Sequence, residues 1–297
     1  MMARLLRLML LSEAMFYLVL ATVLHRYADW SLAACAWLAL GLACAGRALV
    51  IKVTYFYALQ HRSNIAPELA VGYARWLIEG WRELAHFCWL FSLVLPFERL
   101  FYAGDALPQA GHKALLLLHG YQCNRAFWWW MAPRLVARGF NVGTLNLESV
   151  HTSIDNYVDA VAARIEVLCR ESGEERVVLV GHSMGGLVAR AYLRRYGHGR
   201  VAKLVTIGSP HHGSELARLG LGENARQMRP DSAWLKALQG TPVTVPSVAL
   251  YSPHDNYVMP QDSAKLQGAQ LIALPGLGHL AMATSPAVLE AICAAAA

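Results

Sequence analysis

The chain has 297 residues, which is enough for one large α/β domain together with an extension. Hydrophobic residues make up 56% of it and charged residues only 15%, so it is either a membrane protein or an enzyme with a membrane segment attached. The formal net charge is +6, but no run of lysine and arginine carries it, which argues against nucleic-acid binding. The six cysteines form no CxxC pair or metal-like cluster, so the sequence requires no disulfide.

Two apolar runs, residues 8–24 and 30–45, lie close together near the start of the chain, and a short polar link at 25–29 joins them. A bilayer core requires about 20 apolar residues per helix, and both runs approach that length. The second run reaches it if the side chain of Arg47 extends to the membrane surface. We therefore expect residues 1–53 to form a transmembrane helical hairpin.

The first run has an alternative interpretation as a cleaved signal peptide, because Arg4 and Arg7 resemble a basic n-region. Glu13 interrupts the apolar stretch, however, no small-residue cleavage site follows it, and a second run comes at once. These features favour a retained anchor in a bacterial inner membrane. Arg4, Arg7, Arg47 and Lys52 favour a cytoplasmic N-terminus and a cytoplasmic return.

A third apolar run, residues 85–95, ends at Pro96 and is too short to span a membrane, so we expect an interfacial or buried helix. If it did span, the rest of the chain would lie on the other side, so the side of the membrane stays open. Residues 54–111 interleave aromatic and basic residues, as membrane interfaces do. We expect them to form a helical, interfacial connector, although a plain connector with half-buried aromatics fits the same pattern.

From residue 112 onward, short apolar strands alternate with helical patterns, which predicts a mostly parallel sheet flanked by helices. Strands of such a sheet are buried on both faces and therefore consist of continuous apolar residues. The expected strands are 114–118, 141–147, 176–181, 203–208, 247–251 and 270–274, and the expected helices are 126–138, 154–171 and 184–196. We take residues 112–297 as the catalytic domain.

The candidate nucleophile is Ser183, in the pattern G-x-S-x-G between Gly181 and Gly185. An apolar strand precedes this pattern and a helical pattern follows it, and this context distinguishes a nucleophile turn from a chance match. The turn is so tight that side chains at 181 and 185 would clash. The neighbouring His182 is expected to pack or to line the site rather than to act as the base.

The candidate oxyanion donors are the backbone N–H groups of Tyr121 and Met184. Tyr121 follows the first strand of the domain, where the loop of such folds supplies one donor, and Met184 follows the nucleophile. His119, at the start of that loop, is expected to shape it. His211 and His212 invite a metal hypothesis, but adjacent residues do not share a face, so we expect no metal and no cofactor.

The candidate acid and base are Asp255 and His279, because this fold requires the chain order Ser, Asp, His. Asp255 comes just past the strand at 247–251, and Asp262 is the competing carboxylate further along. His279 follows the last strand after two glycines, which allow its loop to turn toward the serine. In this scheme His279 takes and returns the serine proton while Asp255 orients the imidazole.

Five segments carry a family resemblance: HGY at 119–121, GHSMGGLVAR at 181–190, LVTIGSPHHGS at 204–214, QMRPDSAWL at 227–235 and GLGHL at 276–280. Together they resemble the bacterial triacylglycerol lipase/esterase branch of the α/β hydrolases, over about residues 112–292. They are also similar to the lipase-like domain of GPI-inositol deacylases. The resemblance implies carboxylic ester hydrolysis.

Two features depart from the secreted lipases of that branch, which often hold a structural calcium through aspartates. No aspartate or glutamate occurs between 263 and 289, so we expect no calcium, and the stretch between 210 and 241 leaves room for only a small lid. The sequence therefore predicts a membrane-anchored serine hydrolase acting on an acyl ester or lipid. An acyltransferase using the same triad, and a non-catalytic membrane scaffold, are the alternatives.

Overall fold

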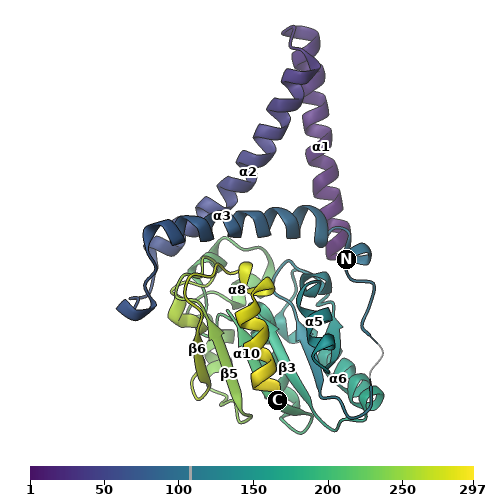
Figure 1. Ribbon diagram of the computed structural model, residues 1–297, viewed down its shortest axis with the longest axis vertical. Coiled ribbons are helices and arrows are strands. Elements are labelled where there is room, and N and C mark those ends of the chain that lie inside the picture. Colours follow the sequence, from purple (N-terminus) through teal and green to yellow (C-terminus); the bar gives the residue numbers. More distant parts are fainter. Residues whose placement is uncertain (107–108) are drawn as a thin grey trace.

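The computed structural model describes residues 1–106 and 109–297, with a helical N-terminal region mounted on an α/β domain (Figure 1). The domain contains one six-stranded sheet in the order β2-β1-β3-β4-β5-β6, and every neighbouring pair is parallel. The strands are β1 (Ala114–Leu118), β2 (Asn141–Leu145), β3 (Val177–His182), β4 (Val201–Ile207), β5 (Ser247–Tyr251) and β6 (Gln270–Ala273). The predicted fold class is confirmed, and β1 and β5 have the bounds predicted from sequence.

Helices cover both faces of the sheet. The α-helices of the domain are α5 (Met131–Ala137), α6 (Val158–Ser172), α7 (Met184–Tyr196), α8 (Gly222–Gln227), α9 (Ala233–Gln239) and α10 (Pro286–Ala296). Short 3₁₀ turns are η3 (Arg125–Trp128), η4 (Ile154–Tyr157), η5 (Glu215–Arg218), η6 (Gln261–Ala264) and η7 (Ala281–Thr284). The stretch between residues 210 and 241, expected to hold a small lid, forms η5, α8 and α9.

The core of the domain lies on the two sides of the sheet, because successive side chains of a strand point to opposite faces. In β1, Leu115 and Leu117 face a core shared with α5 and α10, whereas Leu116 and Leu118 face a core shared with α6 and α7. All four leucines are fully buried. Burial of each such side chain stabilises the fold by roughly 1.5–3 kcal/mol relative to exposure, so the continuous leucine run favours a strand that is covered on both faces.

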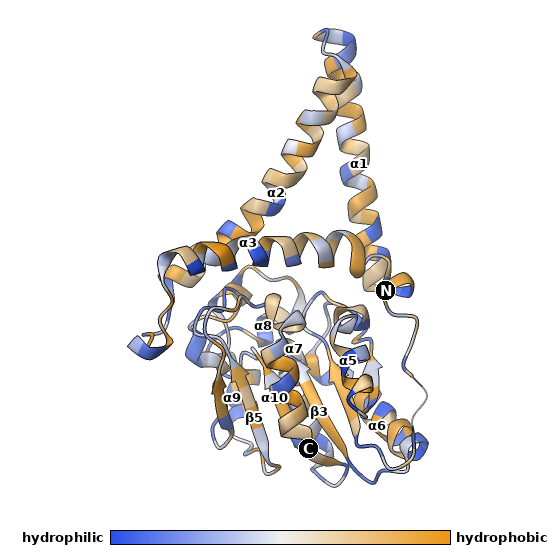
Figure 2. Cartoon of the chain, in the orientation of Figure 1, coloured by the Kyte–Doolittle hydropathy of each residue, from blue (hydrophilic) through white to orange (hydrophobic). Residues whose placement is uncertain are grey.

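The N-terminal region consists of a long helical hairpin and a helix that lies across its base. The hairpin is α1 (Met2–Tyr27) and α2 (Leu32–Gln60), and α3 (Tyr73–Trp89) continues into the π-helical turn η2 (Leu90–Val94). The remaining elements are η1 (Pro67–Leu69) and α4 (Glu98–Phe101). The hairpin extends away from the domain, its surface is largely apolar, and α3 lies between it and the domain (Figures 1 and 2).

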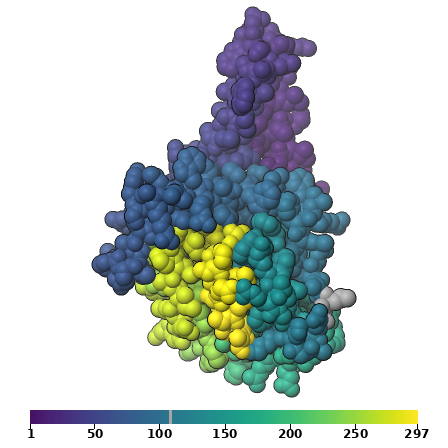
Figure 3. All heavy atoms as spheres, in the orientation of Figure 1, coloured from purple at the N-terminus to yellow at the C-terminus, as the bar shows by residue number. Residues whose placement is uncertain are grey.

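The third apolar run lies in α3 and η2, where it packs on the domain. Leu90, Val94 and Leu95 are completely buried and share one core with α5 and α10. Met2 and Leu6, at the base of α1, are buried in the same core. The N-terminal region and the domain therefore share a hydrophobic core. In Figure 3 the residues of α3, coloured blue, cover one side of the domain.

Candidate active site

Ser183 occupies the turn between β3 and α7, in a backbone conformation that side-chain-bearing residues rarely adopt. Its φ is 55° and its ψ is −125°, and its N–H donates to the carbonyl oxygen of Ile207 at 2.9 Å. A Cβ at position 185 would lie 2.2 Å from the carbonyl oxygen of Leu118, so only glycine fits there. Such strain is typical of a nucleophile turn, which holds the serine hydroxyl away from the backbone of its own turn.

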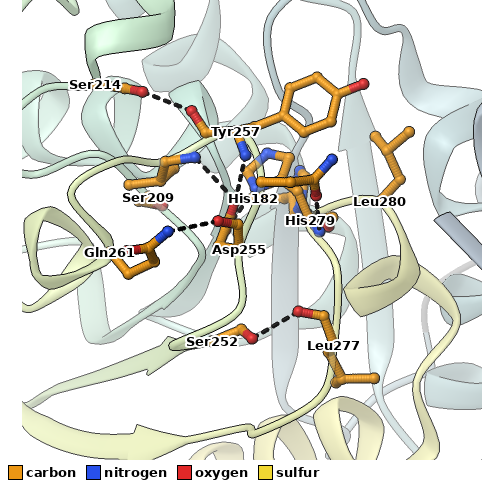
Figure 4. A network of polar contacts seen from close by, with 12 residues as sticks. His182, Ser209, Ser214, Ser252, Asp255, Tyr257, Gln261, Leu277, His279 and Leu280 are labelled. Carbon is orange, nitrogen blue, oxygen red and sulfur yellow. Dashed lines mark hydrogen bonds and ion pairs between the residues drawn. The ribbon is translucent and has the colours of Figure 1, made fainter. Parts of the chain in front are cut away.

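Asp255 and His279 lie together at the carboxyl ends of β5 and β6. The Nδ1 atom of His279 is 2.8 Å from the Oδ2 atom of Asp255, and both side chains are almost completely buried (Figure 4). The other carboxylate oxygen of Asp255 accepts the N–H groups of Tyr257 and Val258 at 2.7 and 2.9 Å. These three hydrogen bonds fix the carboxylate, which in turn fixes the tautomer and orientation of the imidazole.

The competing carboxylate, Asp262, lies elsewhere. It pairs with Lys265 at 2.6 Å on η6, and its side chain is about half exposed. Of the two candidate carboxylates, Asp255 and not Asp262 therefore forms the hydrogen bond with His279.

Opposing effects act on the pKa of His279. Burial lowers the pKa, but the charge of Asp255 and its hydrogen bond favour the imidazolium, and the net shift is upward. The charge of Glu83 acts in the same direction. An imidazole in this setting gains a proton more readily than a free one, as a general base requires.

Aromatic rings surround the His279 imidazole. The ring of Tyr257 stacks against it with centroids 5.1 Å apart, and the ring of His182 lies 4.6 Å away on another side. His182 itself packs against Phe127, and its Nε2 atom is 3.2 Å from the His279 carbonyl oxygen. Burial keeps the pKa of His182 well below its ordinary value, so this histidine packs beside the site, as predicted, in the neutral form.

The loop after β1 runs directly past the serine. A Cβ at Gly120 would lie 3.0 Å from the Cβ of Ser183, which brings the adjacent backbone of Tyr121 to the same place. The hydroxyl of Tyr121 accepts the N–H of Leu221 at 2.9 Å and donates to its carbonyl at 2.7 Å, which ties this loop to the stretch before α8. Met184, the other candidate donor, is the first residue of α7.

His119 has a structural role in this loop. Its Nδ1 atom bonds to the carbonyl of Gly120 at 2.9 Å, and its Nε2 atom accepts the N–H of Leu147 at 3.1 Å. Burial lowers its pKa to about 4, so the ring stays neutral and can accept.

His211 and His212 do not form a metal site with their neighbours. The buried His211 bonds to Thr206 at 3.1 Å and to Arg190 at 3.3 Å. Within residues 1–106 and 109–297, no three side chains of the metal-binding types gather closely enough to hold an ion.

Three residues at the site were not predicted from the sequence. Glu83, on α3, accepts the backbone N–H groups of Leu280 and Ala281 at 2.8 and 3.0 Å. Asn256 accepts the N–H of His279 at 3.1 Å, and its own amide donates to Thr54 of α2 at 2.8 Å. The only local signal for Glu83 was a carboxylate in a helix that is otherwise rich in apolar and aromatic residues.

A cavity of about 540 Å³ opens at the edge strand β2, away from these residues. Its lining includes Asp105, Arg125 and Arg164. Arg164 pairs with Asp105 at 2.6 Å and Arg125 with Glu98 at 2.8 Å, so its charges neutralise one another. None of its lining residues belongs to the Ser183 site, and its polar character does not suit an acyl chain.

Comparison with known proteins agrees with the fold. A family model described as alpha/beta hydrolase fold matches residues 113–229. The triacylglycerol lipase of Pseudomonas fragi is 37% identical over 94 residues, which is 28% of this chain and 32% of that protein. That of Pseudarthrobacter phenanthrenivorans is 30% identical over 111 residues, or 35% of this chain and 34% of that protein. The chain spans about a third of the length of these curated relatives.

Two solved structures share the architecture. The mature lipase BlEst2 of Bacillus licheniformis has a TM-score of 0.58 at 16% identity, covering 65% of this chain and 96% of its own. Lipase B of Aspergillus fumigatus has a TM-score of 0.57 at 20% identity, covering 63% and 53%. The chain therefore has the α/β-hydrolase fold, with distant similarity to bacterial triacylglycerol lipases and to lipase structures.

Proposed function

We propose that the protein is a membrane-anchored serine hydrolase that cleaves carboxylic esters, lipid esters among them, through an acyl-enzyme on Ser183. The observation that carries this proposal is the buried hydrogen bond between Asp255 and His279, at the same edge of the sheet as the strained Ser183 turn. Nucleophilic catalysis by serine requires a base for the nucleophile and a carboxylate behind the base, and this pair supports the assignment of both roles.

In the acylation step, the Ser183 oxygen attacks the ester carbonyl carbon while His279 takes the serine proton. The carbonyl oxygen becomes an oxyanion, and the backbone N–H groups of Tyr121 and Met184 stabilise it. When the tetrahedral intermediate collapses, the C–O bond to the alcohol breaks, and His279 returns the proton to the departing oxygen. Asp255 stabilises the imidazolium that exists between these two transfers.

In the deacylation step, water replaces the alcohol. His279 takes a proton from water as it attacks the acyl carbon, and the acid product leaves when the proton returns to Ser183. Both steps use the same oxyanion donors, and the loss of one such donor typically lowers the rate by about 10²–10³.

The hairpin supports a membrane setting and a lipid-like substrate. No residue in the apolar stretch of α1 is buried, and 11% of the stretch in α2 is, so both helices offer apolar surface far larger than a soluble protein leaves uncovered. Burial of Met2 and Leu6 in the domain core favours retention of α1 over its removal as a leader. Arg4 and Arg7 lie at the end of the hairpin that meets the domain, and the positive-inside rule then favours the cytoplasmic side for both.

The test is turnover of p-nitrophenyl esters of rising chain length by the full chain in detergent micelles, with Ser183→Ala as the comparison. We expect hydrolysis by the wild type and only background rates from the variant. A preference for long acyl chains would favour a lipase over an esterase. Equal turnover by the two proteins would refute the role of Ser183.

A further inference from the structure

Helix α3 is docked along the segment that carries His279. Three of its side chains make polar contacts there, spread over the length of the helix. Arg75 donates to the carbonyl of Pro275 at 3.2 Å, Glu83 accepts from two backbone N–H groups, and His86 Nε2 lies 2.6 Å from the Thr284 hydroxyl. The helix therefore holds the residues on both sides of the histidine.

Glu83 makes the central contact of the three. The two residues that it contacts directly follow His279 in the sequence. Its side chain is completely buried, and its two carboxylate oxygens accept the N–H groups of Leu280 and Ala281 separately. A Cβ at position 278 would lie 2.4 Å from one of these oxygens. A side chain at position 278 would therefore have to displace the Glu83 carboxylate.

A carboxylate is a costly way to fasten a loop, because burial disfavours its charge. Burial raises the pKa of Glu83 to about 7, although the two N–H donors and the nearby His279 act in the opposite direction. A neutral acceptor would fasten the loop at lower cost. A carboxylate also supplies negative charge beside an imidazole that must become positive during the reaction.

A second contact from the N-terminal region reaches the other side of the histidine. The N–H of His279 donates to Asn256, and the amide of Asn256 donates to Thr54 of α2. Thr54 and Asn256 are both buried. Side chains thus bind the backbone N–H groups of three consecutive residues, 279 to 281. Glu83 of the N-terminal region binds two of them, and Asn256, which is itself bonded to that region, binds the third.

We propose that Glu83 is a positioning residue for His279, so that α3 of the N-terminal region completes the active site of the α/β domain. This inference rests on the proposed function, since it presupposes that His279 is the base. Glu83 acts on it in two ways. It fixes the backbone from which the imidazole extends toward Ser183, and its charge favours the imidazolium.

The charged and titratable groups around Glu83 lie on the loop after β5, on α2 and on α3 itself. Asp255 and Tyr257 lie on the loop after β5, Tyr55 lies on α2, and Glu79 lies one turn earlier on α3. Of these groups, Asp255 is hydrogen-bonded to the imidazole, and its charge and that of Glu83 both raise the pKa of His279. Removal of the Glu83 charge therefore leaves His279 with a single negative neighbour, and its pKa falls.

The test compares Glu83→Gln with the wild type as full chains in micelles, and uses Glu79→Gln as the matched control. Glu79 is a nearly buried glutamate of the same helix, but it bonds to Arg82 and not to the histidine segment. We expect Glu83→Gln to lower kcat roughly 10- to 100-fold, the scale of a misplaced catalytic group, with KM unchanged. We also expect the acid limb of its kcat profile to move to lower pH, and Glu79→Gln to behave as the wild type.

A merely structural role would not move the acid limb. Wild-type kcat and an unmoved acid limb in Glu83→Gln would overturn the inference and leave the proposed function intact. If the wild type shows no turnover beyond what Ser183→Ala retains, the proposed function is refuted, and the inference with it. If Glu83→Gln fails to fold, Glu83→Asp decides: lowered kcat with a shifted acid limb supports the inference, and an unmoved acid limb overturns it.

Discussion

The buried carboxylate of Glu83 predicts a pH dependence of stability that does not depend on any assigned activity. The perturbation is Glu83→Gln, which removes the ionisation and keeps the size of the side chain. In the folded protein burial raises the pKa of Glu83 to about 7, from an ordinary value of 4.5. The folded state therefore binds the Glu83 proton more tightly than the unfolded state does between these two values.

The sign follows from this difference in proton binding. Below pH 4.5 the group is neutral in both states and has no effect. As the pH rises toward 7, the unfolded state ionises first, so the unfolding free energy of the wild type falls. The pKa of about 7 in the folded state exceeds the ordinary value of 4.5 by about 2.5, and at 1.36 kcal/mol per pKa unit the full difference in unfolding free energy amounts to about 3 kcal/mol.

The assay is thermal unfolding of both proteins in the same detergent at pH 5 and pH 8. Effects of groups that the two proteins share largely cancel in the difference between them. About 2.5 kcal/mol of this difference falls between pH 5 and pH 8. On raising the pH, we therefore expect the wild type to lose about 5 to 10 °C of Tm relative to Glu83→Gln, because 1 kcal/mol corresponds to about 2–4 °C for a domain of this size. A Tm difference that is the same at both pH values would refute the reasoning, and Glu79→Gln should follow the wild type.

Other predictions concern the acid, the shared core and the fate of the acyl group. Asp255→Asn should lower kcat by about 10³–10⁴-fold in the ester assay, because the imidazole loses its orienting carboxylate, whereas Asp262→Asn should change it little. Leu90→Ala should lower the unfolding free energy by about 2–5 kcal/mol in denaturant titrations, and the same change at the exposed Leu100 should have almost no effect. Added alcohol should not divert the acyl group of a hydrolase, so mass spectrometry that finds mainly the new ester would favour the acyltransferase alternative.

The positions of the strands along the chain and the residues that follow them were predictable, since they depend on local pattern. Ser183, Asp255 and His279 each follow an apolar strand, and parallel strands bring their carboxyl ends to one edge of a sheet. The competition between Asp255 and Asp262 was also decided by this rule, because only the first follows its strand directly. Local periodicity was therefore sufficient for these positions.

The contribution of the N-terminal region was not predictable, because it depends on contacts between residues far apart in the chain. Glu83 lies 197 residues before Leu280, and nothing in the spacing of either residue indicates the other. The expected boundary after residue 53 falls inside α2, whose C-terminal part carries Thr54. The apolar character of this region indicated a membrane. The sequence could not distinguish its membrane-facing residues from Met2, Leu6 and Leu90, which pack in the core that the region shares with the domain.

Labelling with a fluorophosphonate tests the central claim most directly, because this reagent modifies only a serine that an adjacent base has activated. The full chain in micelles is treated with the reagent, digested and sequenced by mass spectrometry, alongside Ser183→Ala and His279→Ala. We predict a single adduct on Ser183 in the wild type and none at this position in either variant. An unlabelled wild type, or labelling of Ser183 that persists without His279, would contradict the account.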